Sequence, residues 1–149
     1  MASFKPEIIF IGKSICPGSP VIINLAFLPI RVKNITFDCS IAHRKYFKYH
    51  KNLIGTTHGD GAKNQDLPLL MATERPILWS ETDYRYVYTH HVHHKNAKDY
   101  IGVTVESLRS PSGTDSWHHV KGYQHAPKAV EGFIHHIEHG QVARLTHIF

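Results

Sequence analysis

Short runs in which apolar and polar residues alternate occupy much of the chain, and alternation with a period of two predicts β-strands. The runs are rich in β-branched and aromatic residues, which favour extended backbone. Strands are predicted at residues 7–11, 21–28, 35–37, 44–51, 52–57, 84–89, 100–108, 130–136 and 141–149. We expect the last two strands to form a hairpin that turns at His139–Gly140, and strands 44–51 and 52–57 to turn at Lys51–Asn52.

The pattern changes between strands 52–57 and 84–89, where two short helices are predicted. Asp66 is expected to cap a helix at residues 67–73, with Pro68 in its first turn. Pro76 then begins a second helix, at residues 77–82, because proline does not fit inside a longer one. The sequence therefore predicts a mixed α/β fold that is rich in strands and contains one short helical insertion.

Composition supports a folded domain with an unusual beginning. At 149 residues, with 42% hydrophobic and 19% charged residues, the chain suits one globular domain. No histidine precedes His43 and no aspartate precedes Asp38, so the start of the chain differs in chemistry from the rest. We divide the sequence into a divergent apolar segment, residues 1–34, and a domain at residues 35–149.

The net charge of +5 and the pI of about 9.3 favour an anionic partner such as nucleic acid. Strand 44–51 alternates basic and aromatic residues, a pattern that pairs phosphate contacts with base stacking. The candidate phosphate contacts are Arg44, Lys45, Lys48 and Lys51. The alternative interpretation is an ordinary half-buried strand.

Two cysteines do not form a disulfide framework, and a reducing compartment is the simpler interpretation. The longest apolar run, residues 20–30, is too short and too interrupted to cross a membrane. The start of the chain also lacks a signal-peptide pattern. We expect a cytoplasmic protein, in a microbe or in a cell infected by a phage.

Fourteen histidines are the most unusual feature of the composition. His58 follows strand 52–57, and His91-Val92-His93 follows strand 84–89, so both groups lie at the carboxyl ends of predicted strands. Ligand sites of α/β sheets gather at such ends, and neutral imidazole is the commonest metal ligand. The alternatives are a hydrogen-bonded loop histidine at His58 and a surface cluster at residues 90–94. Structural roles are expected for the remaining pairs and singles, His118, His119, His135, His136 and His139.

Thr56-Thr57-His58-Gly59-Asp60, followed by His91-Val92-His93, resembles the last two motifs of the calcineurin-like metallophosphoesterases. The sequence is similar to a phage and bacterial branch of that family described as DNA-repair exonuclease-like. Residues 67–74, 112–115, 117–118 and 122–123 have counterparts in that branch. The match covers residues 34–149. The resemblance implies the C-terminal half of an α/β sandwich that binds divalent metal, Mn²⁺ or Zn²⁺. His58 and His91 would bind one ion and His93 the other. His90 replaces a family glycine, so the turn is distorted or His90 is a substitute ligand.

The other ligands of that family come from Asp-x-His, Gly-Asp and Gly-Asn-His motifs in its N-terminal half. None of these precedes His58, and the chain contains no Asn-His pair. Three neutral imidazoles suit one Zn²⁺ with water, whereas two cations held close together need carboxylates to screen them. We therefore expect a phosphodiesterase-like or nuclease-like fragment that is inactive alone. It would act with a complementing N-terminal fragment or as a homo-oligomer on a phosphoester or nucleic acid. The alternative is a non-catalytic nucleic-acid-binding or structural module.

Overall fold

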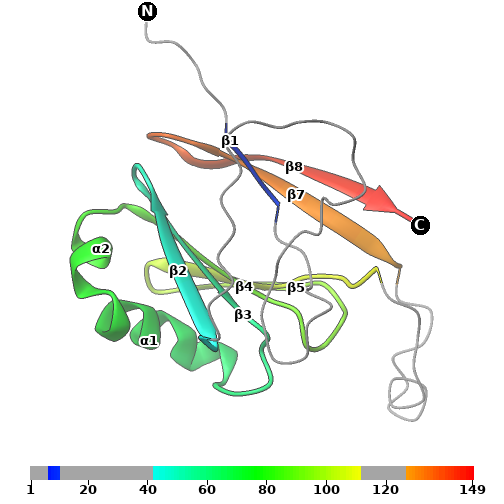
Figure 1. Ribbon diagram of the computed structural model, residues 1–149, viewed down its shortest axis with the longest axis horizontal. Coiled ribbons are helices and arrows are strands. Elements are labelled where there is room, and N and C mark those ends of the chain that lie inside the picture. Colours follow the sequence, from blue (N-terminus) through cyan, green and yellow to red (C-terminus); the bar gives the residue numbers. More distant parts are fainter. Residues whose placement is uncertain (1–6, 11–41, 112–126) are drawn as a thin grey trace, which may run out of the picture.

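In the part of the chain that the structure describes, the elements are two β-sheets, two short α-helices and a 3-10 helix (Figure 1). The computed structural model describes residues 7–10, 42–111 and 127–149. The strands are β1 (Glu7–Phe10), β2 (Arg44–Tyr49), β3 (Asn52–Thr57), β4 (Tyr84–Thr89), β5 (Asn96–Tyr100), β6 (Val103–Ser107), β7 (Ala129–His136) and β8 (Gly140–Ile148). The helices are the 3-10 helix η2 (Asn64–Asp66), α1 (Leu67–Glu74) and α2 (Pro76–Ser80).

The larger sheet has the order β2-β3-β4-β6-β5. Its three inner strands β3, β4 and β6 are parallel, and the two outer strands pair with them in antiparallel fashion. The connection from β3 to β4 runs through the helices, as a parallel pair requires a crossover. This confirms the mixed α/β class. The smaller sheet has the order β1-β7-β8 and is antiparallel.

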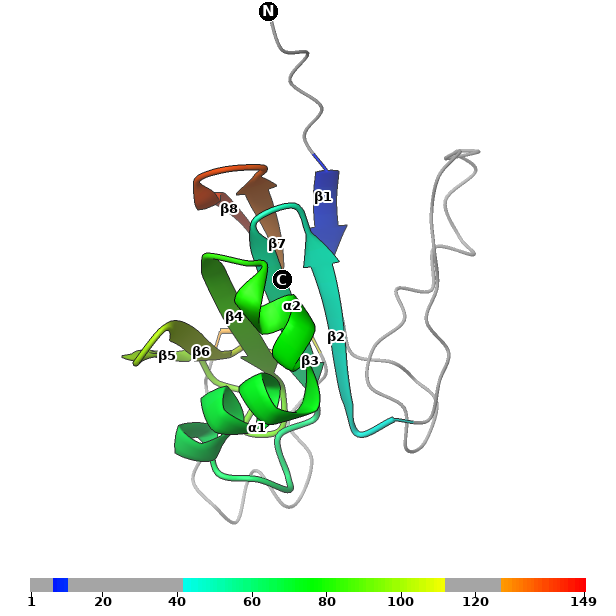
Figure 2. The same ribbon diagram turned by 90° about the vertical axis from the view of Figure 1, so that its left-hand side faces the viewer.

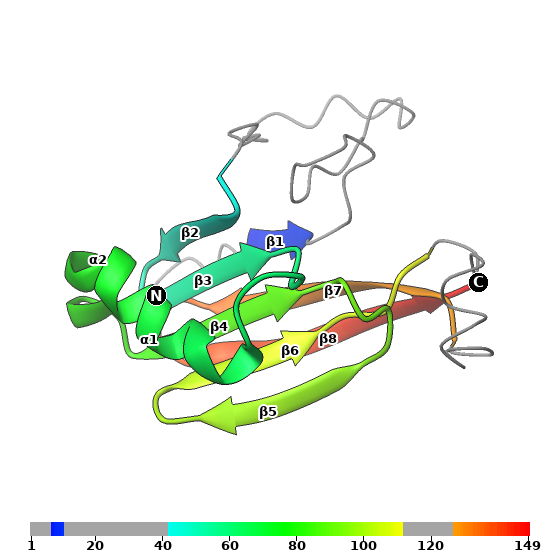
Figure 3. The ribbon, with the colours of Figure 1, turned by 90° about the horizontal axis from the view of Figure 1, so that it is seen from below.

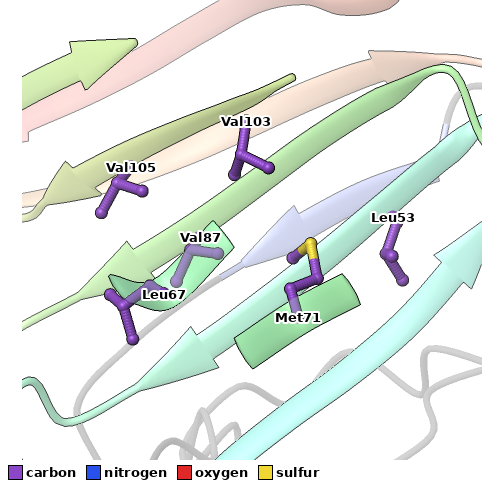
Figure 4. Packing of buried hydrophobic residues seen from close by; sticks show 6 residues of the cluster. All are labelled: Leu53, Leu67, Met71, Val87, Val103 and Val105. Atoms are coloured by element: carbon purple, nitrogen blue, oxygen red, sulfur yellow. The ribbon is translucent and has the colours of Figure 1, made fainter. Parts of the chain in front are cut away.

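The helices cover one face of the larger sheet, and the smaller sheet lies against the other face (Figures 2 and 3). Leu67 and Met71 of α1 pack on Leu53 of β3, Val87 of β4 and Val105 of β6 (Figure 4). Burying side chains of this size contributes about 1.5–3 kcal/mol each. The hydrophobic effect thus fixes the helical crossover on the sheet.

A second apolar cluster joins the two sheets. It consists of Ile54, Tyr88, Leu108 and Phe133, all at most 2% exposed. The Tyr88 and Phe133 rings stack with centroids 4.5 Å apart. The parallel strands are therefore buried on both faces, by the helices on one face and by the smaller sheet on the other.

Several predicted boundaries need correction. The strand predicted at residues 100–108 is shorter and forms β6, Val103–Ser107. Strand β5, Asn96–Tyr100, was not predicted, and it is joined to β6 by a turn at Ile101–Gly102, where Gly102 has a φ of +76°. The β2–β3 hairpin turns at His50–Lys51 and not at Lys51–Asn52, since Asn52 already pairs with Tyr49. His50 takes a φ of +48° there.

The helix and hairpin ends also shift slightly. Helix α1 extends to Glu74, and α2 covers Pro76–Ser80 instead of residues 77–82. Asp66 precedes α1, but its side chain makes no capping hydrogen bond to that helix. The closing hairpin is confirmed, although Gly140 belongs to β8 and not to the turn.

The N-terminal prediction is confirmed in part, because β1 forms close to the predicted strand 7–11 and pairs with β7. The strands predicted at 21–28 and 35–37, and the family-like residues at 112–115, 117–118 and 122–123, lie outside the described residues. Within the described ranges, no helix is long and apolar enough to cross a membrane.

Candidate histidine site

The two histidine loops leave the same edge of the larger sheet. Strands β3 and β4 are parallel neighbours, so their carboxyl ends lie side by side. The carbonyl oxygen of His58 accepts hydrogen bonds from the amides of His90 and His91, at 3.0 and 2.8 Å. These backbone bonds hold the loop after β3 against the loop after β4.

The side chains of the two loops meet as well. Nε2 of His58 lies 3.3 Å from Nδ1 of His91, and the rings make an edge-to-face contact with centroids 5.1 Å apart. Both residues are half-buried. A hydrogen bond between two ring nitrogens needs one donor and one acceptor, and the tautomers of the two rings decide which nitrogen donates. The sequence prediction that His58 and His91 converge is thus matched by their geometry.

Backbone conformation explains the close approach. Gly59 has a φ of +97°, and a Cβ at this position would lie 3.0 Å from Cβ of Thr89 and 3.5 Å from Cβ of His91. Only glycine adopts that conformation without strain and leaves this space open. The Gly59 that follows His58 therefore lets the two loops pack together.

The second loop is a tight turn from His90 to His93, closed by a 3.1 Å hydrogen bond from the His93 amide to the His90 carbonyl. His93 has a φ of +55°, whereas His90 keeps a negative φ. The histidine that replaces the family's glycine therefore leaves the backbone at position 90 in an ordinary conformation. His90 is buried, at 6% exposure.

The separation of the His58 and His91 ring nitrogens is the one expected for two ligands of a single divalent ion. Nitrogens that share a tetrahedral Zn²⁺ at about 2.0–2.1 Å lie about 3.3 Å from each other, which matches the His58–His91 separation. Among the described residues, however, no group of three or more His, Cys, Asp or Glu side chains is placed to hold a metal. His93 is not gathered with the other two into such a group. The nearby aspartate, Asp60, is exposed.

Three of the four candidate phosphate contacts, which lie in β2 and in the turn after it, form ion pairs with α1 and with the segment between α2 and β4. Arg44 forms a bidentate salt bridge with Glu74, at 2.5 Å for the closest pair of atoms. Lys48 pairs with Glu81 at 2.6 Å, and Lys51 pairs with Asp83 at 3.3 Å. Lys45 is buried, at 9% exposure. The candidate phosphate contacts are therefore brought together along β2 but do not form an open basic surface.

A buried ion network lies between the sheets, and the sequence pattern gave no indication of it. Arg144 of β8 bridges Glu106 of β6 and Glu131 of β7, the latter at 3.5 Å. Arg109 approaches Glu131 at 3.7 Å. Both glutamates are 3% exposed. Their charges are balanced by the two arginines, so the network joins the sheets electrostatically.

Together these elements define a mixed α/β sandwich with a histidine pair at the carboxyl edge of its larger sheet. No family model and no curated protein matches the chain. Among solved structures, the chain is similar to a single and a double mutant of Vps29 from Entamoeba histolytica, with TM-scores of 0.44 and 0.41.

Both matches have 14% sequence identity and cover 78% of this chain. The chain spans 66% of the length of each Vps29 chain. At TM-scores below 0.5 this likeness carries no conclusion about family or activity.

Proposed function

We propose that the chain is the C-terminal part of a metallophosphoesterase-like domain and that His58 and His91 bind one divalent cation, Zn²⁺ or Mn²⁺. The observation that carries the proposal is the 3.3 Å separation between their ring nitrogens. It is supported by the motif resemblance, which pairs these two histidines on the same ion. His93 is the third proposed ligand and would have to turn toward the pair.

Chemistry at this centre is proposed to be incomplete in the isolated chain. A bound divalent cation acts as a Lewis acid that neutralises charge on phosphoryl oxygens. The two imidazoles are neutral ligands, and they bring no carboxylate to bridge a second ion. We therefore propose that phosphodiester hydrolysis requires a complementing chain, and that the substrate is a phosphodiester of the kind cut by the exonuclease-like branch.

Equilibrium dialysis against Zn²⁺ and Mn²⁺, followed by metal analysis, tests the binding. We expect one ion per chain for the unaltered protein and loss of most of it in His58→Ala and in His91→Ala. His139→Ala is the matched control, because His139 is exposed in the turn between β7 and β8. That turn contacts the opposite end of β3, where the Lys51 amide donates to the carbonyl of Ile137. Metal content that is unchanged in both site variants would refute the proposal.

Hydrolysis of bis(p-nitrophenyl) phosphate, with and without Mn²⁺, tests the second half of the proposal. The isolated chain is expected to show no hydrolysis above the buffer blank. Metal-dependent turnover that disappears in His91→Ala would contradict the proposed incompleteness, while leaving the metal site intact.

A further inference from the structure

Among the described residues, strand β8 forms one edge of the smaller sheet, and its chemistry differs from that of the two edges of the larger sheet. Among the described strands it pairs only with β7 (Figure 1). Edge strands of soluble proteins are commonly protected by lysine, proline or other charges. The outer strands of the larger sheet follow that rule: β2 carries lysines that include Lys48, and β5 carries Lys98 and Asp99.

The second half of β8 has no such protection. Leu145, Ile148 and the following Phe149 are 55%, 62% and 70% exposed. The one charged residue of the strand, Arg144, turns its guanidinium to Glu106 and Glu131 in the interior. The edge is therefore neutral and apolar where it meets solvent.

The backbone of this edge is ready to pair. The Phe149 amide donates to the Lys128 carbonyl at 3.0 Å, which places residues 149 and 128 in a hydrogen-bonded pair. Because such pairs alternate along an antiparallel ladder, Thr146 and Ile148 direct their amides and carbonyls away from β7. A strand that docks here gains a row of backbone hydrogen bonds.

We propose that the occupant of this edge is β8 of a second copy of the chain, paired in antiparallel fashion about a twofold axis at Thr146. In this register Thr146 faces Thr146 of the second copy, and Leu145 faces His147. Thr–Thr pairs are favourable across strands, and no like charges oppose each other. A copy of β2 or β5 could not pair with itself so easily, because its lysines would repel.

Charge and size both set the expected affinity. The pairing forms no salt bridge between the two copies. It buries only one strand edge of each, so the buried area is smaller than the roughly 1,200–2,000 Å² of a stable interface. The dimer is therefore expected to be weak, with a dissociation constant on the order of micromolar. It extends the smaller sheet from one protomer into its partner and leaves the histidine site of each protomer unchanged.

Sedimentation velocity across the micromolar range tests the proposal. The unaltered protein should shift reversibly from monomer to dimer, and Ile148→Lys should remain monomeric. Ile101→Lys is the matched control, because Ile101 is 98% exposed in the turn between β5 and β6. A monomer at every concentration, or a dimer that persists in Ile148→Lys, would overturn the proposal.

A crosslinking pair tests the register without relying on the lysine variant. In Thr146→Cys, the two Cα atoms of the hydrogen-bonded pair would lie about 5.5 Å apart, within the range of a disulfide. Mild oxidation should therefore yield a covalent dimer. His147→Cys, one residue along and opposite Leu145, should not crosslink, and the unaltered chain controls for its own two cysteines. Equal crosslinking of both variants would rule out this register.

Discussion

Arg144 of β8 forms a salt bridge with Glu106 of β6, so one guanidinium ties the two sheets together. The Glu106 side chain is 4% exposed and the Arg144 side chain 20%. Arg144 also lies over the Phe133 ring, 4.8 Å from its centroid. Loss of one partner leaves the other charge buried, which costs far more than the pair itself contributes.

Arg144→Ala is therefore expected to lower the free energy of unfolding by about 3–5 kcal/mol. Urea denaturation followed by circular dichroism measures this change. The exposed Lys95→Ala serves as control and should change it by less than about 0.5 kcal/mol. The combination of Arg144→Met with Glu106→Gln should recover part of the lost stability, because it removes the buried charge of Glu106. A loss below about 1 kcal/mol in Arg144→Ala would contradict a buried role for the network.

His135 makes the stability of the protein depend on pH. Its ring is 1% exposed, lies against Tyr86 and faces the Asn52 amide oxygen at 3.4 Å. Its Nε2 has no hydrogen-bond partner in the described part of the chain. Burial lowers the pKa of His135 to about 4, from a usual value of 6.5. Between pH about 4 and 6.5, His135 is therefore neutral in the folded state but protonated in the unfolded chain.

The free energy of unfolding is therefore highest above pH about 6.5, where His135 is neutral in both states. It falls as the pH drops toward about 4, because the unfolded chain then binds a proton that the folded state does not. The loss amounts to about 3 kcal/mol across that window. Urea titrations at several pH values should show a shallower pH dependence in His135→Phe than in the unaltered protein. His139→Asn, which removes an exposed histidine, should keep the original slope. Equal slopes in His135→Phe and the unaltered protein would contradict the assignment.

Gly140 is required at the start of β8. Its φ is +74°, and a Cβ there would lie 2.5 Å from the Tyr86 hydroxyl and 2.8 Å from Cδ1 of Tyr84. That hydroxyl accepts a hydrogen bond from the Gln141 amide at 2.8 Å. Gly140→Ala should lower the unfolding free energy by about 2 kcal/mol or more, because it combines backbone strain with overlap.

Thermal denaturation compares Gly140→Ala with Gly61→Ala. Gly61 has open space where a Cβ would be added, and it keeps an ordinary φ. The Gly61 variant should melt close to the unaltered protein. Two variants that melt at the same temperature would show that the contact with the tyrosines is not tight.

Lys48 of β2 and Lys51 of the following turn are expected to form ion pairs within the fold and not to bind nucleic acid. Fluorescence anisotropy with single-stranded DNA should give the same weak, salt-sensitive binding for the unaltered protein and for Lys48→Gln combined with Lys51→Gln. The reason is that Glu81 and Asp83 already neutralise both lysines. A steep loss of affinity in the double variant, persisting after chelation of metals, would favour the nucleic-acid-binding module instead.

Local patterns were sufficient for those features of the fold that depend on neighbours in the chain. The strand endings at His58 and near His91 are visible in the sequence, and a helical crossover between them makes β3 and β4 parallel neighbours. Strand β5 was missed because its residues, Asn96–Tyr100, are mostly polar and exposed, so they show no alternation of apolar and polar positions. Period-two alternation also marks Glu106 as polar without indicating that a second sheet covers it.

The arrangement of the candidate site also depends on both local and long-range contacts. Residue types and loop positions indicated the His58–His91 pair, because both loops leave neighbouring strands. His93 has a left-handed backbone, at a φ of +55°, and the sequence gives no sign of that. The neutralisation of Arg44 by Glu74 depends on a contact across 30 positions of the chain. Long-range packing decides both features.

The most direct test of the central claim follows the imidazole nitrogens of His58 and His91 by long-range ¹H–¹⁵N NMR during a Zn²⁺ titration. The ring nitrogens that face each other, Nε2 of His58 and Nδ1 of His91, should both change shift and saturate together at one equivalent of zinc. Shifts that remain at their metal-free values in both rings, while exposed histidines such as His139 respond, would contradict the account.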